Sequence, residues 1–111
     1  MFRLRLAAWL ALALAAGPAW ADEPPAPIAV TIKDHRFSPA EIHVAAGKPA
    51  VLQVVNQDDS PEEVESKPLQ IEKVLPPGAA SKVRLRPLAP GRYPFFGEYH
   101  PETAQGIVVV E

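Results

Sequence analysis

Short runs of β-branched residues, separated by proline and glycine turn signals, constrain this chain more than any other feature. Every Val and Ile lies after residue 27, and alternating runs such as Lys82–Arg86 are typical of half-buried strands. Turn signals such as Pro76–Gly78 and Ala89–Gly91 stand between the runs. The pattern predicts an all-β sandwich of about seven strands. The expected strands cover 28–32, 41–44, 51–55, 69–74, 82–86, 92–96 and 107–110.

One segment carries helix-start signals instead. Ser60 is a good N-cap residue, Pro61 suits the first helical position, and acidic residues follow where the first turn would be. We therefore expect one short helical turn over Ser60–Lys67.

The first 21 residues are typical of a secretory signal peptide. Met1–Ala21 has two early arginines, an apolar stretch over Leu6–Ala16 and an A-x-A cleavage signal at Ala19–Ala21. The apolar stretch is shorter than the roughly 20 residues that a membrane span needs. We expect cleavage, export to a bacterial periplasm and no membrane span in the mature chain. Asp22–Pro27 is then a Pro-rich lead-in, and 28–111 forms one domain.

Composition excludes several classes of function. The chain has 11 basic and 13 acidic residues, a net charge of −2 that offers no basic face for nucleic acid. It has no Cys, so disulfides, thiolate metal sites and cysteine nucleophiles are excluded. Serine-hydrolase, zinc-protease and phosphate-loop motifs are absent from the sequence, and we predict no catalytic residue.

An acidic segment over Asp58–Glu65 is the first candidate site. It contains five carboxylates and no basic residue, namely Asp58, Asp59, Glu62, Glu63 and Glu65. Clustered carboxylates repel one another, and a cation removes that cost. Oxygen donors of this kind suit Ca²⁺, Mn²⁺ and Fe³⁺. The alternative is a solvated acidic loop.

The second candidate lies close to the C-terminus. Glu98 and His100 are two residues apart, so on a continuing strand they point to the same side. An imidazole with a carboxylate suits Cu²⁺, Zn²⁺ or iron, and the alternative is an exposed Glu beside a loop His. His43 alternates with apolar neighbours and His35 precedes a turn, so both are weaker candidates.

Four further segments resemble the cupredoxins. They are Phe37–Gly47 (FSPAEIHVAAG), Val54–Asn56 (VVN), Pro90–Phe96 (PGRYPFF) and Gly106–Val109 (GIVV). The resemblance covers about Ile32 to Glu111 and implies a Greek-key β-sandwich.

The same resemblance implies where blue-copper ligands would fall. The two His, the Cys and the Met of that family correspond here to a position near Glu62, then His100, Gly97 and Thr103. Only His100 is retained. Because the thiolate makes such a site blue, a blue electron-transfer site is excluded.

A narrower resemblance covers Pro61–Gly78 (PEEVESKPLQIEKVLPPG) and Pro90–Gly106 (PGRYPFFGEYHPETAQG). Both are similar to the cupredoxin-like domain of periplasmic iron-uptake systems, either the amino-terminal domain of EfeO-type proteins or the stand-alone cupredoxin partner of membrane iron permeases. The resemblance implies that the acidic segment and the last loop meet at one end of the sandwich. It implies a site for Cu²⁺ and/or Fe³⁺ built from Glu62, Glu63, Glu65, Glu98 and His100.

Three functions follow as alternatives. The first is a periplasmic metal-binding accessory protein of iron transport, whose partners are a membrane iron permease and other periplasmic iron-uptake components. The second is a copper-assisted ferroxidase that acts with a membrane partner. The third is a metal-free interaction module whose acidic end binds another protein.

Overall fold

The computed structural model describes residues 25–111 of the 111-residue chain. The predicted signal peptide, Met1–Ala21, and the start of the predicted lead-in lie outside the described residues. In the described part, no helix is long and apolar enough to cross a membrane.

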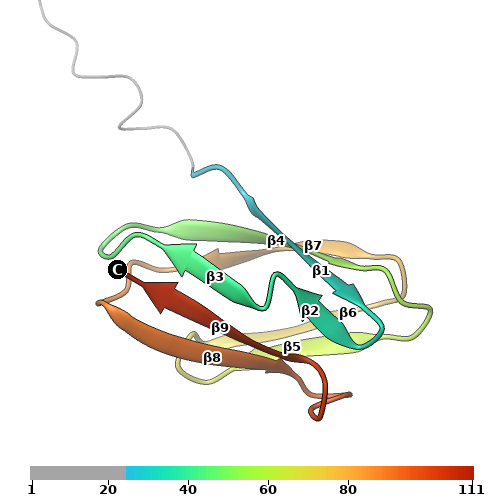
Figure 1. The fold of residues 1–111 in the computed structure, drawn as a ribbon. Coiled ribbons are helices and arrows are strands. Elements are labelled where there is room, and N and C mark those ends of the chain that lie inside the picture. Colours follow the sequence, from blue (N-terminus) through green and yellow to red (C-terminus); the bar gives the residue numbers. More distant parts are fainter. Residues whose placement is uncertain (1–24) are drawn as a thin grey trace, which may run out of the picture.

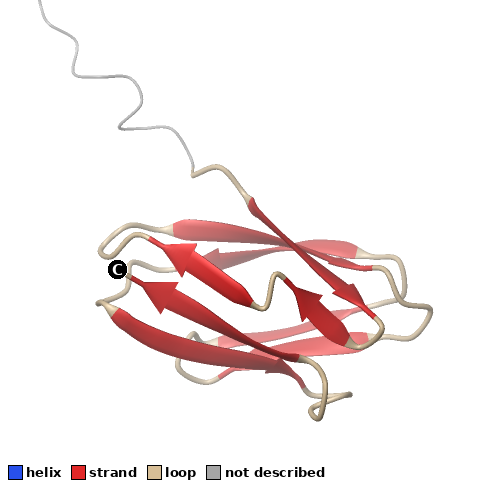
Figure 2. Ribbon diagram, in the orientation of Figure 1, coloured by secondary structure: helices blue, strands red, loops and turns tan. Residues whose placement is uncertain are grey.

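Within residues 25–111, nine strands form two layers, which confirms the predicted all-β sandwich (Figures 1 and 2). The strands are β1 (Ile28–Lys33), β2 (Arg36–Ser38), β3 (Glu41–Val44), β4 (Ala50–Asn56), β5 (Glu62–Ser66), β6 (Ile71–Leu75), β7 (Ala80–Leu85), β8 (Gly91–Gly97) and β9 (Gln105–Val110). One sheet has the order β2-β1-β4-β7 and the other β3-β9-β8-β5-β6. The β1–β4 and β3–β9 pairs are parallel, and the remaining pairs are antiparallel.

The core lies between the sheets and follows the two-residue period of the strands. Val30 and Ile32 of β1 are buried with alternate residues of β4. From the other sheet, Phe95 and Val108 point inward. Phe95 meets Phe37 edge to face, with ring centroids 4.8 Å apart.

The helical turn expected over Ser60–Lys67 is wrong, because Glu62–Ser66 forms strand β5. This strand pairs with β6 along its whole length and with β8 at two positions. Cross-strand pairing buries Val64 in the core, at 3% exposure. A helical turn at this position would lose that burial. The helix-start signals at Ser60 and Pro61 are local and do not include this long-range pairing.

The expected count of about seven strands is also too low, since the described part of the chain forms nine. The two strands not expected from the sequence are β5 and β2. Strand β2 pairs with β1 through a two-residue turn at Asp34-His35. That turn lacks the glycine that normally marks such hairpins, and both of its residues have positive φ. The strand expected over 69–74 is β6, Ile71–Leu75.

Three connections meet at one end of the sandwich, on the right in Figure 1. They are the β1–β2 turn (34–35), the β4–β5 connection (57–61) and the β8–β9 connection (98–104). Contacts join all three: the Asp58 carboxylate accepts from the Asp34 and His35 amides, and the His35 ring stacks on His100. We refer to these three segments as the loop end.

Candidate metal centre

The alternation of β5 divides its carboxylates between two faces of the sheet. Val64 points into the core, so Glu62 and Ser66 point inward as well, and both are buried at 1% exposure. Glu63 and Glu65 therefore point to the outer face. Adjacent glutamates thus belong to different environments.

On the outer face, Glu63 and Glu65 meet Glu98. One carboxylate oxygen from each residue lies within 4.8 Å of the other two. Glu98 directly follows β8, and its backbone N–H donates to the Glu63 carbonyl at 2.8 Å, which fixes it beside β5. Glu63 is buried, Glu65 is half-buried and Glu98 is exposed, so the cluster opens to solvent on one side. We call these three residues the acidic trio.

The acidic trio carries an electrostatic cost. A hydrogen bond with the Glu98 carboxyl group raises the pKa of Glu65 above its ordinary value, and burial and the Glu98 charge add to the effect. Burial, followed by the charges of Glu63 and Glu98, raises the pKa of Tyr99. A proton on Glu65 or a bound cation therefore relieves the repulsion between the Glu65 and Glu98 carboxylates.

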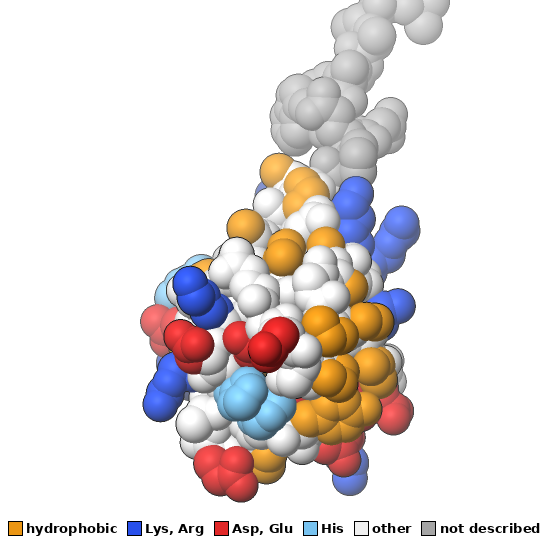
Figure 3. Space-filling view, turned by 90° about the vertical axis from the view of Figure 1, so that its right-hand side faces the viewer, with side chains coloured by type: hydrophobic (Ala, Val, Ile, Leu, Met, Phe, Trp, Pro, Cys, Tyr) orange, Lys and Arg blue, Asp and Glu red, His pale blue; other side chains and the backbone are white. Residues whose placement is uncertain are grey.

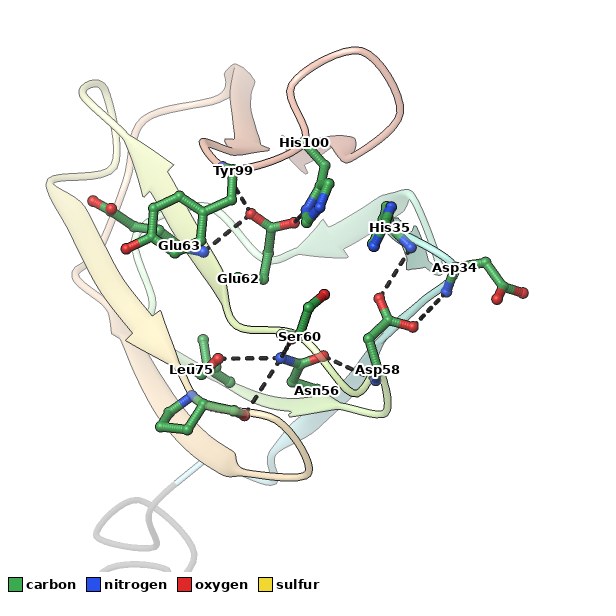
Figure 4. A network of polar contacts seen from close by, with 11 residues as sticks. Asp34, His35, Asn56, Asp58, Ser60, Glu62, Glu63, Leu75, Tyr99 and His100 are labelled. Carbon is green, nitrogen blue, oxygen red and sulfur yellow. Dashed lines mark hydrogen bonds and ion pairs between the residues drawn. The ribbon is translucent and has the colours of Figure 1, made fainter.

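Glu62 serves a different purpose inside the sandwich. Its Oε1 accepts from the backbone N–H of Glu63 at 3.1 Å and of Tyr99 at 3.0 Å. Its Oε2 pairs with His100 Nδ1 at 2.6 Å (Figure 4). A buried carboxylate with this many donors is satisfied within the protein, so Glu62 is a partner of His100 rather than an open ligand.

Gly97 provides the space for the Glu62 carboxylate. A Cβ at position 97 would lie 2.6 Å from Glu62 Cδ, 2.8 Å from Glu62 Oε1 and 2.6 Å from the Ala104 Cβ. The resemblance to blue-copper proteins places their cysteine at this position. Here any side chain at residue 97 would compete with Glu62, so the geometry is consistent with the absence of a thiolate.

Sequence reasoning underrated His35. Its ring stacks on His100 with centroids 3.5 Å apart and an interplanar angle of 10°. Its backbone N–H, and that of Asp34, donate to the Asp58 carboxylate at 3.0 and 2.7 Å. Burial alone would raise the pKa of Asp58, but these bonds outweigh it and lower the pKa. The two-residue turn Asp34-His35 is the local sequence feature that brings His35 to this position. Because the turn has no glycine, the sequence does not mark it as a hairpin.

The third histidine lies elsewhere. His43, on edge strand β3, is exposed, as its alternation with apolar neighbours predicts. Its ring contacts Glu111 at 2.8 Å and Glu41 at 3.2 Å, and the hydrogen bond with Glu111, then that with Glu41, raise the pKa of His43.

The structure thus divides the five predicted ligands into two groups. Glu63, Glu65 and Glu98 converge on the outer face, whereas Glu62 and His100 pair with each other at the loop end. Asp58, also in the acidic segment, holds the β1–β2 turn. Figure 3 views the loop end directly, with histidine side chains near its centre and acidic groups around them.

Both groups offer chemistry that fits a divalent or trivalent ion. The acidic trio supplies oxygen donors, and the loop end supplies imidazoles. Since the chain has no Cys, any copper held by these residues lacks a thiolate ligand and the strong blue colour that the thiolate gives.

Solved structures share this fold. The copper-loaded metal-binding domain of the Cu(I)-exporting ATPase CopA of Streptococcus pneumoniae matches with a TM-score of 0.68 and 20% identity, covering 77% of this chain and 84% of that domain. Auracyanin A of Chloroflexus aurantiacus, a blue copper protein, matches at 0.64 and 15%, covering 79% and 100%. A purple cupredoxin of Nitrosopumilus maritimus matches at 0.55 and 17%, covering 75% and 98%.

Sequence comparison is more specific. An uncharacterised protein of Rickettsia prowazekii is 41% identical over 83 residues, which cover 75% of this chain and 66% of the relative, just under two thirds of its length. Residues 4–110 match the family described as the cupredoxin-like domain. A metal-binding role fits this fold. The chain belongs to the cupredoxin-like domain family.

Proposed function

We propose that this protein is a metal-binding accessory of a periplasmic iron-transport system. It would take up iron on the acidic trio and work beside a membrane iron permease and other periplasmic components. The similarity of Pro61–Gly78 and Pro90–Gly106 to the EfeO-type and permease-associated cupredoxins supports the iron-transport role.

The convergence of the acidic trio is the observation that carries the proposal. Glu63, Glu65 and Glu98 come from β5 and from the end of β8, and they hold carboxylate oxygens within 4.8 Å of one another. Carboxylates without a soft donor suit Fe³⁺ and accept Cu²⁺, but disfavour Cu⁺. One open side leaves room for water or for a ligand from the delivering or receiving molecule.

A titration with Fe³⁺, supplied as citrate, tests this proposal. We expect stoichiometric binding by calorimetry, and weakening of at least about tenfold when Glu65→Gln and Glu98→Gln remove two charged donors together. At free metal 100 times Kd, binding to the folded state should add about 2.7 kcal/mol of stability, visible as a higher melting temperature.

Glu102→Gln is the matched control for that titration. It removes one carboxylate charge from the β8–β9 connection, which also carries Glu98, but Glu102 is exposed and outside the acidic trio. Equal Fe³⁺ affinity in the control and in the double variant would place the metal elsewhere. If the unaltered protein does not bind, the acidic trio is not an iron site, and a protein-docking role takes precedence.

The pKa of Glu65 predicts how stability depends on pH without metal. Its folded-state pKa lies above the ordinary value of 4.5, so its contribution is fully present below pH 4.5 and is lost as pH rises through the folded pKa. We expect Glu98→Gln to remove this loss, and so to melt at a higher temperature than the parent at pH 7. Near pH 3.5 the two melting temperatures should converge. A lower melting temperature for Glu98→Gln at pH 7 would contradict this interpretation.

A further inference from the structure

We propose that the outer face of the β2-β1-β4-β7 sheet binds the anionic surface of a lipid bilayer. Four cationic side chains project from this side of the molecule, and we call it the basic face. They are Lys33, Arg36, Lys82 and Arg84. The acidic trio belongs to the other sheet, so membrane binding and iron binding can fail independently of each other.

The charges of the strands are divided between the two sheets. Strands β1, β2, β4 and β7 contain no Asp or Glu. The strands of the other sheet contain five glutamates against one lysine and one arginine. Because the chain as a whole has a net charge of −2, attraction to an anionic surface has to come from one oriented face. The basic face is the side of the sandwich that can supply it.

The two-residue period of the strands places all four cations on the solvent side. Ile32, Phe37 and Val83 point into the core, so the cations that neighbour them in sequence point outward. All four cations are exposed, and none makes an ion pair with a residue that the structure describes. Figure 3 shows Lys and Arg side chains, and no acidic one, along the upper right side of the molecule.

The pairing of β1 with β2 sets two of these cations against each other. Lys33 and Arg36 lie directly opposite in the register of the two strands. Like charges in opposite positions destabilise a sheet. The nearby carboxylates of Asp34 and Asp58 do not form an ion pair with either cation. An anion bound at this position would relieve the repulsion.

A hollow at the β7 edge of the basic face has the chemistry of a lipid headgroup site. Its volume is about 240 Å³, and it is lined by Pro25, Pro27, Val51, Lys82 and Arg84. Two cations suit a phosphate group, while the three apolar side chains suit the carbon chain to which a lipid phosphate is joined. The long stems of Lys and Arg can lie along such an apolar surface with their charges in water.

The place where the chain enters the domain favours a bilayer over an acidic protein as the partner. Pro25 and Pro27 directly precede β1, so the start of the described chain lies at the basic face. The predicted signal peptide, with its apolar stretch, comes shortly before them in the sequence. Since that stretch is expected to engage a membrane during export, a bilayer is the anionic surface that this face meets first.

Flotation with lipid vesicles tests the proposal. The chain from Asp22 onward is used, because it keeps all nine strands and the predicted signal peptide would bind vesicles by itself. We expect binding to vesicles of phosphatidylglycerol mixed with phosphatidylcholine, and release at about 1 M salt, where the Debye length falls to about 3 Å. Lys82→Gln/Arg84→Gln should lower the partition coefficient at least about tenfold, because each cation near an anionic bilayer contributes about fivefold.

Lys67→Gln/Lys73→Gln is the matched control. It removes the same charge, but from exposed positions on β6 and on the turn before it. This variant should bind vesicles as the parent does, and thermal melting should show that both double variants are folded. No binding to anionic vesicles, equal binding to pure phosphatidylcholine, or an equal loss in the control would overturn the proposal. Binding to polyglutamate but not to vesicles would also overturn it, because the partner would then be an acidic protein.

Discussion

Gly97→Ala is expected to lower the melting temperature by roughly 10–20 °C, the largest effect of any one-methyl change at the candidate centre. The new Cβ would lie 2.6 Å from both Glu62 Cδ and Ala104 Cβ, and real contacts of this kind are essentially never that close. Ala104 is completely buried and Glu62 is 1% exposed, so neither has room to retreat. Overpacking together with a displaced carboxylate should cost about 2–3 kcal/mol. Differential scanning calorimetry measures it directly.

Two comparisons separate this cause from a general glycine effect. Gly47 has φ of 72° but open space around its Cβ position, so Gly47→Ala should show only backbone strain of about 1 kcal/mol. Glu62→Ala removes the carboxylate, one of the two groups with which the new Cβ of Gly97→Ala would clash. The double variant should therefore be less destabilised than the two single effects combined. Strict additivity would show that the Glu62 carboxylate is not what position 97 accommodates.

The same geometry bears on engineering a blue site. Cysteine at position 97 would restore the thiolate that the family resemblance places there, but its Cβ meets the Glu62 carboxylate. The single substitution should therefore disturb the Glu62–His100 pair before it adds a copper ligand. The buried glutamate and a ligand at residue 97 exclude each other here.

Alternation and turn residues predicted most of the fold. Runs such as Lys82–Arg86 carry the two-residue period that buries Val83 and Leu85, so strand and core could be inferred together. Strand β5 could not be predicted in this way, because Glu62 and Ser66 occupy inward-facing positions. In an alternating sequence pattern, polar residues such as these normally indicate the solvent side. Hydrogen bonds that no sequence pattern shows satisfy them: Glu62 pairs with His100 and accepts from the Glu63 and Tyr99 backbone N–H groups, and Ser66 Oγ donates to the Pro94 carbonyl and accepts from the Leu69 N–H.

The candidate centre was predictable in its residue types but not in its arrangement. The acidic segment and Glu98 indicated carboxylate ligands, and three of those carboxylates do converge. Their separation from His100 follows from β5 being a strand, because Glu62 and Glu63 then face opposite ways. A helical turn would have allowed a single site. His35 joins the loop end through the Asp58 bonds, which connect residues 23 and 24 positions apart and leave no local pattern.

Asn56→Ala should produce the second large effect, a loss of about 2–4 kcal/mol. Asn56 is completely buried at the end of β4. Its Nδ2 donates to the carbonyls of Ser60 and Leu75 at 2.9 and 3.1 Å, and its Oδ1 accepts from the Asp58 N–H at 3.0 Å. Alanine would leave these groups unpaired in a place that water cannot readily fill. Chemical denaturation should show the loss, whereas Gln57→Ala, at an exposed neighbour, should stay within about 0.5 kcal/mol.

The consequences for metal binding should be selective. Asn56 holds the segment that carries Asp58 and Ser60, and Asp58 in turn closes the turn that carries His35. Loosening this segment should disturb the loop end while leaving Fe³⁺ binding on the acidic trio nearly unchanged, because the acidic trio is fixed by β5 and β8. Titrating folded Asn56→Ala with Fe³⁺ measures this. A large loss of Fe³⁺ affinity would mean that the outer face and the loop end respond as one unit, which the separate anchoring of the two groups argues against.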